Sequence, residues 1–361
     1  MSTLFLQLIY SVGLTLAAAA ILFPVMIKLS PKLGLVDIPN YRKFHRQPVP
    51  AIGGLVIVLS IGVVAAFSNP LQAFIGNHLA MVAAIIVMMV TGLVDDRLNL
   101  SVKLRLLLQI LCACAIGWDG ALITSLHGLF GTHELPVIVQ YLLTVLVVTG
   151  VTNAFNLMDG IDGLAGGMSL INIFMLAVMS IMTPGKGWLF LLLPLCAALV
   201  IFLKYNWRPA KIFMGDSGSL VFGLIISTVG INFIREAGDN GSMLTSEFIV
   251  LVTGSCMIPV LDAVRVFYSR IKKGKSPFHP DRTHLHHLLT KHYQVHSRAT
   301  NKIIRLHISI LITSFVAAAF LNVYWVIVMQ VVGVALYMNF LRMMSYFYRW
   351  YRVIKKMELA P

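Results

Sequence analysis

The chain has 361 residues, of which 58% are hydrophobic and 12% charged, and its mean hydropathy is +0.85. A soluble domain carries about a quarter charged residues, so this composition excludes one. The net charge of +14 comes from 28 Lys and Arg against 14 Asp and Glu. Because the apolar residues form blocks about 20 residues long, enough to cross a bilayer, we expect an all-α polytopic integral membrane protein.

Eleven apolar runs, taken in chain order, predict eleven transmembrane helices. They are residues 4–27, 51–68, 79–94, 104–118, 136–155, 164–182, 187–203, 217–234, 247–268, 303–321 and 324–341. The first run has no basic segment before it and no small-residue cleavage site, so it is typical of a membrane helix rather than a cleaved leader. All four cysteines fall inside these runs and indicate neither a disulfide framework nor a thiolate metal site.

The basic residues orient the chain. Of the 28 Lys and Arg, only Lys186 and Arg235 fall in one alternate set of connecting segments, and the other 26 lie on the opposite side. By the positive-inside rule this side is cytoplasmic, which puts the N-terminus outside and the C-terminus inside. We expect one membrane-embedded domain over residues 1–361, with a basic, histidine-rich loop at 269–302 and a basic tail at 342–361 that contacts anionic headgroups.

Five aspartates lie at or just beyond the ends of the apolar runs, all on the predicted cytoplasmic side. They are Asp95, Asp96, Asp159, Asp162 and Asp216. A carboxylate near hydrocarbon is costly unless it faces a wet, paired or metal-bound site. Carboxylates from three separated segments on one face therefore suggest a Mg²⁺-phosphate site.

The first motif is Asp95-Asp96-Arg97. Adjacent carboxylates repel, so the pair needs a cation, a basic partner or a shared proton. One acid can position a metal while the other handles a proton. The alternative is a solvated helix end with Arg97 as counter-ion. Lys103 and Arg105 follow closely in the sequence. They either bind phosphate or only contribute to the positive-inside orientation of the chain.

The second motif spaces Asn153, Asn156, Asp159 and Asp162 three residues apart, which places them on one face if the segment is helical. Four glycines in 160–167 allow a tight connection and a close backbone approach to a ligand. Asn and Asp oxygens are hard ligands that suit Mg²⁺. A glycine-rich turn with capping side chains is the alternative, but it does not explain so many polar groups.

The third motif, Phe213 to Ser219, opens an apolar run with Asp216. Asp216 is either an N-cap or the partner of a metal-phosphate group at a helix N-terminus. Phe213 either stacks on a base or packs against other side chains.

The fourth motif is the basic segment 270–287, which contains four histidines. Zinc is disfavoured because no Cys accompanies the histidines and Lys and Arg surround them. A phosphate clamp is more natural, because Arg offers a planar fork and His donates hydrogen bonds near neutral pH. A solvated positive-inside loop would explain the lysines but not the histidines. Just before this segment, we predict a structural ion pair between Asp262 and Arg265.

Together the four motifs resemble the polyprenyl-phosphate N-acetylhexosamine-1-phosphate transferases, an integral membrane family. The resemblance covers nearly the whole chain, from 37–40 and 50–54 to the histidine-rich loop. Residues 276–287 are most similar to the bacterial branch that starts O-antigen and enterobacterial common antigen lipids. That branch transfers N-acetylglucosamine-1-phosphate from UDP-GlcNAc to undecaprenyl phosphate. The muramyl-pentapeptide branch usually has a Lys before its Gly pair, where this chain reads Gln47 to Pro50.

The resemblance implies roles for single residues. It implies a Mg²⁺ cofactor, for which Mn²⁺ substitutes, held by Asp216 and Asn156. Asp95, Asp96 and Asp159 would be catalytic, the first two beside the acceptor phosphate. Substrate-binding residues would be Lys103, Asn153, Asp162, Phe213, Arg282, His284, His286 and His287. Among these, Phe213 and Asp162 would contact the uracil.

The resemblance also implies the reaction and its setting. Undecaprenyl phosphate would attack the β-phosphorus of UDP-GlcNAc directly, on the cytoplasmic face of the bacterial inner membrane, to give undecaprenyl-pyrophosphoryl-GlcNAc and UMP. Membrane lipids are expected contacts and nucleic acid is not, while a homo-oligomer is left open.

Alternative functions are the same chemistry with another UDP-HexNAc, or for a teichoic acid or peptidoglycan precursor. A CDP-alcohol phosphotransferase would need an Arg soon after Asp159-Gly160, which the chain lacks. A cation transporter would place acidic residues near the bilayer midplane rather than at one face.

Overall fold

The computed structural model describes residues 2–39, 47–183, 185–276, 283–293 and 295–358. Most of these residues are helical. The helices are α1 (Ser2–Leu33), α2 (Gly53–Phe67), α3 (Asn69–Asn77), α4 (Leu79–Leu98), α5 (Val102–Trp118), α6 (Val137–Met158), α7 (Leu164–Met182), α8 (Leu189–Asn206), α9 (Gly215–Asp239), α10 (Thr245–Lys272), α11 (Leu285–Tyr293), α12 (His296–Ala318) and α13 (Val323–Glu358), with two short 3₁₀ turns, η1 (Leu129–Gly131) and η2 (Lys186–Trp188). A two-residue antiparallel ribbon joins β1 (Val36–Asp37) to β2 (Val49–Pro50).

Among the described residues, nine helices are long and apolar enough to cross a membrane, and α2 with α3 makes a tenth if that bent pair is one span. The prediction of an all-α polytopic membrane protein is therefore confirmed. The run 104–118 corresponds to α5, which has only 17 residues, so the number eleven stays a prediction. The pair α2 and α3 bends by 110° because Ser68 is extended and α3 starts directly after it, with Pro70 in its first turn.

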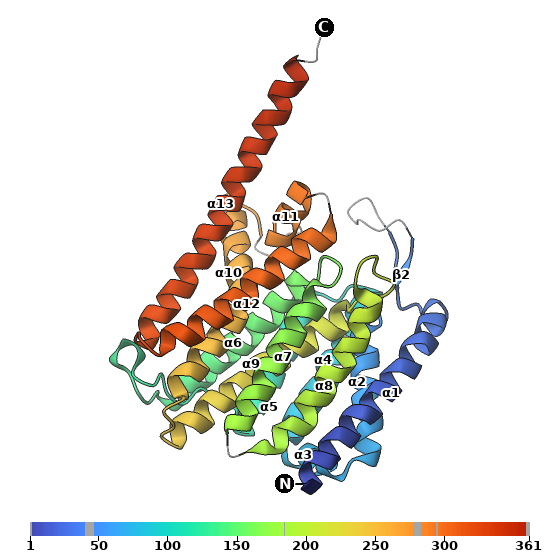
Figure 1. Cartoon of the computed structure of the whole chain (residues 1–361), viewed down its shortest axis with the longest axis vertical. Helices are drawn as coiled ribbons and strands as arrows, with labels where there is room; N and C mark the ends of the chain where they lie inside the picture. The colour runs from blue at the N-terminus through green and yellow to red at the C-terminus, as the bar shows by residue number, and fades with distance from the viewer. Residues whose placement is uncertain (1, 40–46, 184, 277–282, 294, 359–361) are drawn as a thin grey trace.

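The helices pack side by side and alternate in direction (Figure 1). The chain begins at one end of the bundle and α13 leaves it at the other, the end that also carries the β ribbon and α11. Termini at opposite ends of the bundle require an odd number of membrane crossings, as the charge pattern predicts. Which of the two ends faces the cytoplasm stays a prediction.

Helix α9 forms the centre of the bundle, and most of its residues are buried. The backbone of its first turn is in contact with glycines of α2 and α4. A Cβ added at Gly54 or Gly92 would overlap the backbone of 216–218. Only glycine permits such an approach, and it fixes the start of α9 beside the end of α4.

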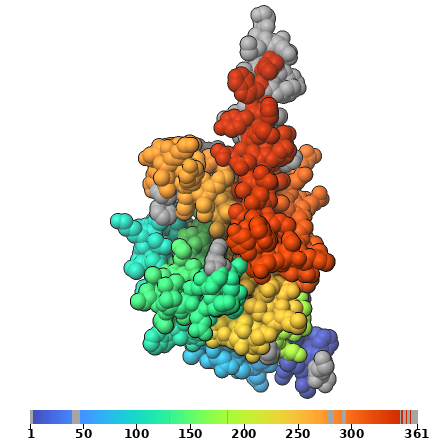
Figure 2. Space-filling view, turned by 90° about the vertical axis from the view of Figure 1, so that its left-hand side faces the viewer, coloured from blue at the N-terminus to red at the C-terminus, as the bar shows by residue number. Residues whose placement is uncertain are grey.

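Helix α13 spans 36 residues, about 54 Å at 1.5 Å per residue. Its membrane-spanning part is Val323–Met344, and the rest continues beyond the bundle in the same direction (Figures 1 and 2). The predicted basic tail is thus mainly an extension of this helix, since no Gly or Pro interrupts 342–358.

Candidate functional site

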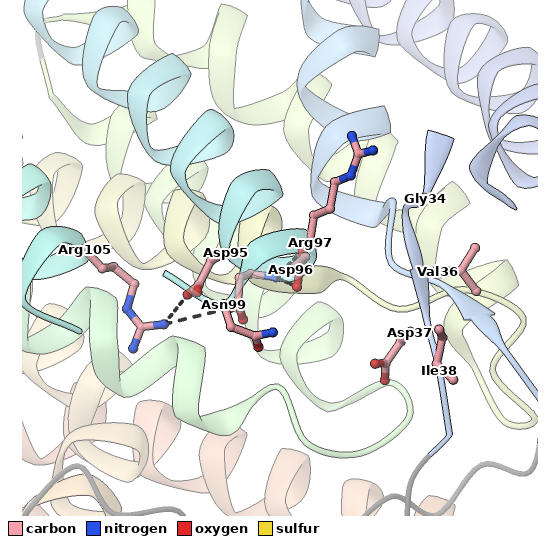
Figure 3. A pocket seen from close by; sticks show the side chains of 10 residues that line it. Gly34, Val36, Asp37, Ile38, Asp95, Asp96, Arg97, Asn99 and Arg105 are labelled. Atoms are coloured by element: carbon pink, nitrogen blue, oxygen red, sulfur yellow. Dashed lines mark hydrogen bonds and ion pairs between the residues drawn. The ribbon is translucent and has the colours of Figure 1, made fainter. Parts of the chain in front are cut away.

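A cavity of about 550 Å³ opens where the end of α4, the start of α5 and the start of α9 meet the β ribbon (Figure 3). Its lining residues are Gly34, Val36, Asp37, Ile38, Asp95, Asp96, Arg97, Asn99, Arg105 and Asp216. Four aspartates therefore share one cavity with two arginines.

Asp95 is buried and has two partners. Arg105 Nη1 donates to its Oδ2 at 2.5 Å, and the Leu100 N–H donates to its Oδ1 at 2.8 Å. The chain returns in this way because Asn99 ends α4 in the left-handed conformation, at φ 52°. The counter-ion of Asp95 is thus Arg105 of α5, and the exposed Arg97 lies beside Gly34 instead.

Asp96 joins α4 to α9. Its two carboxylate oxygens accept from the backbone N–H of Asp216, at 3.0 and 3.2 Å. Asp216 is the second residue of α9, and Met214 is the N-cap, so the alternative interpretation of Asp216 as the N-cap is wrong. Gly215, at φ +72°, provides the turn that places Asp216 in the first turn of α9.

The Asp216 carboxylate faces α6 and α5. Its Oδ1 accepts from Asn156 Nδ2 at 2.7 Å, and the same amide lies 3.0 Å from Ser219 Oγ. The other carboxylate oxygen of Asp216, Oδ2, lies 3.9 Å from Arg105 Nη1. The two predicted metal ligands, Asp216 and Asn156, are therefore in direct contact.

Asp159 follows the end of α6 and lies half-buried near Asp216. Its carboxylate accepts the N–H of Gly215. Burial, followed by the negative charge of Asp216, raises the pKa of Asp159 to about 7. This carboxyl group therefore holds its proton to a much higher pH than an ordinary aspartate.

The donor set fits a hard divalent cation. No group of three or more His, Cys, Asp or Glu in the described part of the chain is arranged to hold a metal alone. Mg²⁺ commonly uses one or two carboxylates and completes its shell with water and substrate phosphate. Asp216 and Asn156 offer such oxygens, since the Asn amide can be turned to present Oδ1. Nearby Asp95, Asp96 and Asp159 add negative charge that a cation offsets.

Two predicted substrate residues lie away from this cavity. Asn153 Nδ2 donates to Gln109 and to the Thr149 carbonyl, so its amide links α6 to α5. Asp162 accepts from the Ala210 N–H at 3.3 Å and from His296 Nδ1 at 3.4 Å. Burial alone would raise the pKa of Asp162, but the hydrogen bond and charge of His296 outweigh burial and lower it.

Two further predicted substrate residues, Phe213 and Lys103, are not among the residues that line the cavity. Phe213 is half-buried, and its backbone pairs with the segment after β2, since its N–H donates to the Pro50 carbonyl at 2.8 Å and its carbonyl accepts from the Gly53 N–H at 2.9 Å. Lys103 lies exposed in the first turn of α5, two residues before Arg105.

His284 is buried and held by α10. Its Nδ1 lies 2.9 Å from Asp262 Oδ2, and its Nε2 lies 3.5 Å from Arg270 Nη2. The Asp262 carboxylate also accepts from Arg265 at 2.6 Å and from the Leu285 N–H at 3.0 Å. The predicted Asp262–Arg265 pair is confirmed, but its histidine partner was not foreseen, because local spacing cannot reveal a contact across 22 residues.

His286 brings α11 onto the glycine-rich turn. Its ring is buried and lies so close to Gly160 that a Cβ there would overlap it. His287 packs against it at 4.2 Å between ring centroids. Burial, followed by the charge of His287, lowers the pKa of His286 well below its usual value, so the ring is neutral. Arg282, the remaining predicted residue of this segment, lies outside the described residues.

Comparisons with known proteins show to which family the chain is related. Residues 78–234 match the glycosyl transferase family 4 profile. The chain is 32% identical over 298 residues to the undecaprenyl-phosphate alpha-N-acetylglucosaminyl 1-phosphate transferase of Yersinia pestis, covering 80% of this chain and 77% of that protein. It is 30% identical over 274 residues to the Escherichia coli K12 protein of the same name, covering 73% and 71%.

A protein of Bacillus subtilis named as a probable undecaprenyl-phosphate N-acetylglucosaminyl 1-phosphate transferase is 30% identical over 288 residues, covering 79% of this chain and 77% of that protein. The family match runs from just before α4 to the last part of α9. It therefore includes Asp95, Asp96, Asp159 and Asp216, whereas α10 to α13 lie outside it.

Proposed function

The chain belongs to glycosyl transferase family 4 and is a membrane glycosyl-1-phosphate transferase, and from this premise we propose that it transfers N-acetylglucosamine-1-phosphate from UDP-GlcNAc to undecaprenyl phosphate. The observation that carries the proposal is the meeting of Asp95, Asp96 and Asp216 with Arg105 at one cavity at the end of the membrane helices. The names of the relatives support the choice of donor and acceptor.

In the proposed reaction, an oxygen of the acceptor phosphate forms a bond to the β-phosphorus of UDP-GlcNAc. The bond from that phosphorus to the bridging oxygen breaks, and UMP leaves with the electron pair. Both reactants are polyanions, so neutralising charge is the main catalytic demand. We favour this direct attack over an aspartyl-phosphate intermediate.

Asp216 and Asn156 are the proposed ligands of Mg²⁺, with Mn²⁺ as a substitute. Bound there, the cation would neutralise the diphosphate and polarise its oxygens. Arg105 supplies fixed positive charge on the opposite side of Asp216, 3.9 Å from its Oδ2. Asp95 forms an ion pair with this guanidinium. The proposed role of Asp95 is therefore to orient Arg105, as well as to face the acceptor phosphate.

Asp96 and Asp159 are the proposed proton-handling pair. Asp96 lines the cavity, and Asp159 lies beside Asp216. A carboxyl group with a pKa of about 7 is matched to accept the last proton of a phosphate monoester near neutral pH. This match supports Asp159 as the base that prepares the acceptor.

The remaining predicted residues are proposed to bind the donor. Phe213 and Asp162 would contact the uracil, since the segment that holds Asp162 through Ala210 leads directly to Phe213. Lys103 would meet the diphosphate at the exposed start of α5. Arg282, His286 and His287 would contact the diphosphate or the sugar. Asn153 and His284 would support neighbouring groups through Gln109 and Asp262.

We further propose that the site faces the cytoplasm in the bacterial inner membrane and that the product enters O-antigen or enterobacterial common antigen synthesis. The bias of Lys and Arg to one side supports the orientation. The similarity of 276–287 to one branch of the family supports the pathway. Restoring the surface glycan in a bacterium that lacks its own transferase would test the pathway.

The decisive experiment is UMP release by the purified protein with undecaprenyl phosphate, Mg²⁺ and each of several UDP-sugars. We expect release with UDP-GlcNAc and loss of release when a chelator removes the metal. UMP release only with another UDP-HexNAc would show that the donor is that sugar nucleotide and not UDP-GlcNAc. No UMP release with any UDP-sugar would contradict the proposed function. A phosphosugar adduct trapped on Asp95, Asp96 or Asp159 would overturn direct attack.

A further inference from the structure

A second cavity, of about 610 Å³, opens at the end of the bundle opposite the carboxylate cavity. The α5–α6 loop, the start of α10 and the turn between α12 and α13 form its wall, at the end of the bundle where the chain begins (Figure 1). Its volume lies within the range of about 300–1,000 Å³ that small-molecule sites occupy. Among the described residues, none lines both cavities, so this is a separate candidate site.

One wall of this second cavity is aromatic. Tyr324 and Trp325 lie in the first turn of α13, with ring centroids 5.3 Å apart and ring planes at 74°. The two residues are 41% and 60% exposed, so most of the Trp325 side chain is open to a ligand. Aromatic residues at this height also serve simply as membrane-interface anchors. An anchor has no need of polar side chains around it, however, and this cavity has them.

Each of the three segments contributes a polar side chain with hydrogen-bonding capacity to spare. Asn322 Oδ1 accepts the Tyr324 N–H at 3.0 Å and so caps α13, which leaves Asn322 Nδ2 for a ligand. Neither Ser246 Oγ nor a ring nitrogen of His127 forms a hydrogen bond with another described residue. An amide, a hydroxyl and an imidazole together supply both donors and acceptors. The cavity can therefore bind a ligand that does the same.

The loop that carries His127 is held in a costly conformation. His127 has φ +49°, in the left-handed region that costs a residue with a Cβ about 1 kcal/mol. Gly128 follows at φ +84°, and its N–H fixes the turn by donating to the Thr132 carbonyl at 3.0 Å. Backbone strain of this kind is concentrated at ligand-binding sites. Burial lowers the pKa of His127 and outweighs the charge of Asp239, so the ring is neutral and offers one donor and one acceptor.

The charges around this second cavity disfavour an ionic ligand. No Lys, Arg, Asp or Glu is found among the described residues that line it. This end of the bundle is net acidic, with five acids against two bases: Asp119, Glu134, Glu236, Asp239 and Glu247 against Lys186 and Arg235. A phosphate, including that of a lipid headgroup, would meet net negative charge and no guanidinium or ammonium group. An ammonium group would find no carboxylate in the wall, so a neutral polar molecule fits best.

We propose that this cavity binds a neutral saccharide, with a sugar ring against Trp325 and its hydroxyl groups on the three polar side chains. One face of a pyranose ring carries polarised C–H groups, which pack against the negative face of an aromatic ring. Its hydroxyl groups both donate and accept, as a neutral imidazole and an amide require. In the predicted orientation this cavity opens on the outer side of the membrane. The proposal does not depend on the proposed transferase activity, because its residues do not line the carboxylate cavity.

Saturation-transfer NMR on the full chain in nanodiscs tests the site. The probes are N-acetylglucosamine and maltose, with UDP in excess so that a sugar bound beside the carboxylates does not contribute. We expect transfer to the sugar ring protons in the wild type, and binding at least about tenfold weaker in Trp325→Ala. The matched control is Trp118→Ala, because Trp118 is 86% exposed at the same end of the bundle and does not line the cavity. Its sugar binding should equal that of the wild type.

A second variant separates binding from folding. Asn322→Ser keeps an oxygen that caps α13 but removes the amide, so thermal unfolding should match the wild type while sugar binding weakens about fivefold. Adding a neutral glucosyl lipid to the nanodisc distinguishes the sources of the sugar. Loss of the free-sugar signal would show that a lipid-borne sugar occupies the site, and an unchanged signal would favour a free glycan.

Three results would overturn the proposal. The first is no saturation transfer with either sugar, and the second is equal transfer in the wild type and Trp325→Ala. The third is transfer that depends on Trp325 with glycerophosphoethanolamine but not with the sugars, which would identify a lipid-headgroup site instead.

Discussion

The carboxylate cavity and the α11 segment use the same residue types in opposite ways. Around the cavity, Asp95, Asp96 and Asp216 converge, and Arg105 forms ion pairs with Asp95 and Asp216. At α11, the single carboxylate of Asp262 is buried and meets His284, Arg265 and the Leu285 N–H. The first group has an excess of negative charge facing open space, whereas the second satisfies its own charge internally.

This difference separates a binding site from the framework that supports it. A buried charge with complete partners stabilises the fold, and its removal leaves those partners unpaired. A crowded group of carboxylates costs stability until a ligand arrives. Exchanging aspartate for asparagine should therefore have opposite effects on stability in the two regions.

The largest expected effect is on activity in Asp216→Asn. Because it removes the proposed metal ligand, UMP release should fall at least about 100-fold, while metal-free stability stays equal or rises. Thermal unfolding with and without Mg²⁺ measures the second part, and Mg²⁺ should stabilise only the wild type. The matched control is Asp239→Asn, at the exposed far end of the same helix. Unchanged activity and unchanged Mg²⁺ dependence in Asp216→Asn would show that the metal assignment is wrong.

The next effect is on stability in Asp262→Asn. Losing the charge that Arg265 and His284 meet should cost about 2 kcal/mol, since hydrogen bonds to charged groups contribute about 1.5–3 kcal/mol each. Thermal unfolding in detergent checks the loss, and activity should fall less than in Asp216→Asn. A stability gain would contradict the view that this region is internally balanced.

A smaller effect is expected where the two regions touch. Gly160→Ala places a methyl group on the His286 ring and should push α11 from the turn that carries Asp159 and Asp162. The KM for UDP-GlcNAc should rise about tenfold, which corresponds to about 1.4 kcal/mol of lost binding, with kcat changing less. Gly150→Ala is the control, because a Cβ there meets no atom within 4 Å. Equal kinetics in the two variants would mean that the regions act independently.

The smallest effect is a pH dependence of stability. The pKa of Asp159 is about 7 in the folded protein and 3.8 by ordinary reference, so the folded chain keeps a proton that the unfolded chain has lost. Stability from this group is complete at low pH and falls as the pH rises from about 4 to about 7. In metal-free buffer the melting temperature of Asp159→Asn should exceed that of the wild type by more at pH 8 than at pH 5. A difference that does not vary with pH would exclude the raised pKa.

The membrane helices could be predicted from the sequence, because a helix that crosses the lipid must consist of a long run of apolar residues. It missed the bend at Ser68 and the extension of α13, since both depend on backbone conformation more than on hydropathy. In the site it identified the carboxylates but not their pairing. Asp96 and Asp216 are 120 residues apart, so their contact cannot be predicted from local spacing. The ion pair between Arg105 and Asp95 and the contact between Asp262 and His284 likewise form only when separate helices pack together.

The glycine contacts at the start of α9 bear on how fast the protein exchanges its ligands. Gly54 and Gly92 touch the first turn of α9 through backbone atoms, which have no rotamers to change. The spacing between Asp96 and Asp216 is therefore preorganised and does not relax when the cavity empties. Under the proposed function, the site would therefore need little reorganisation before the next substrate enters.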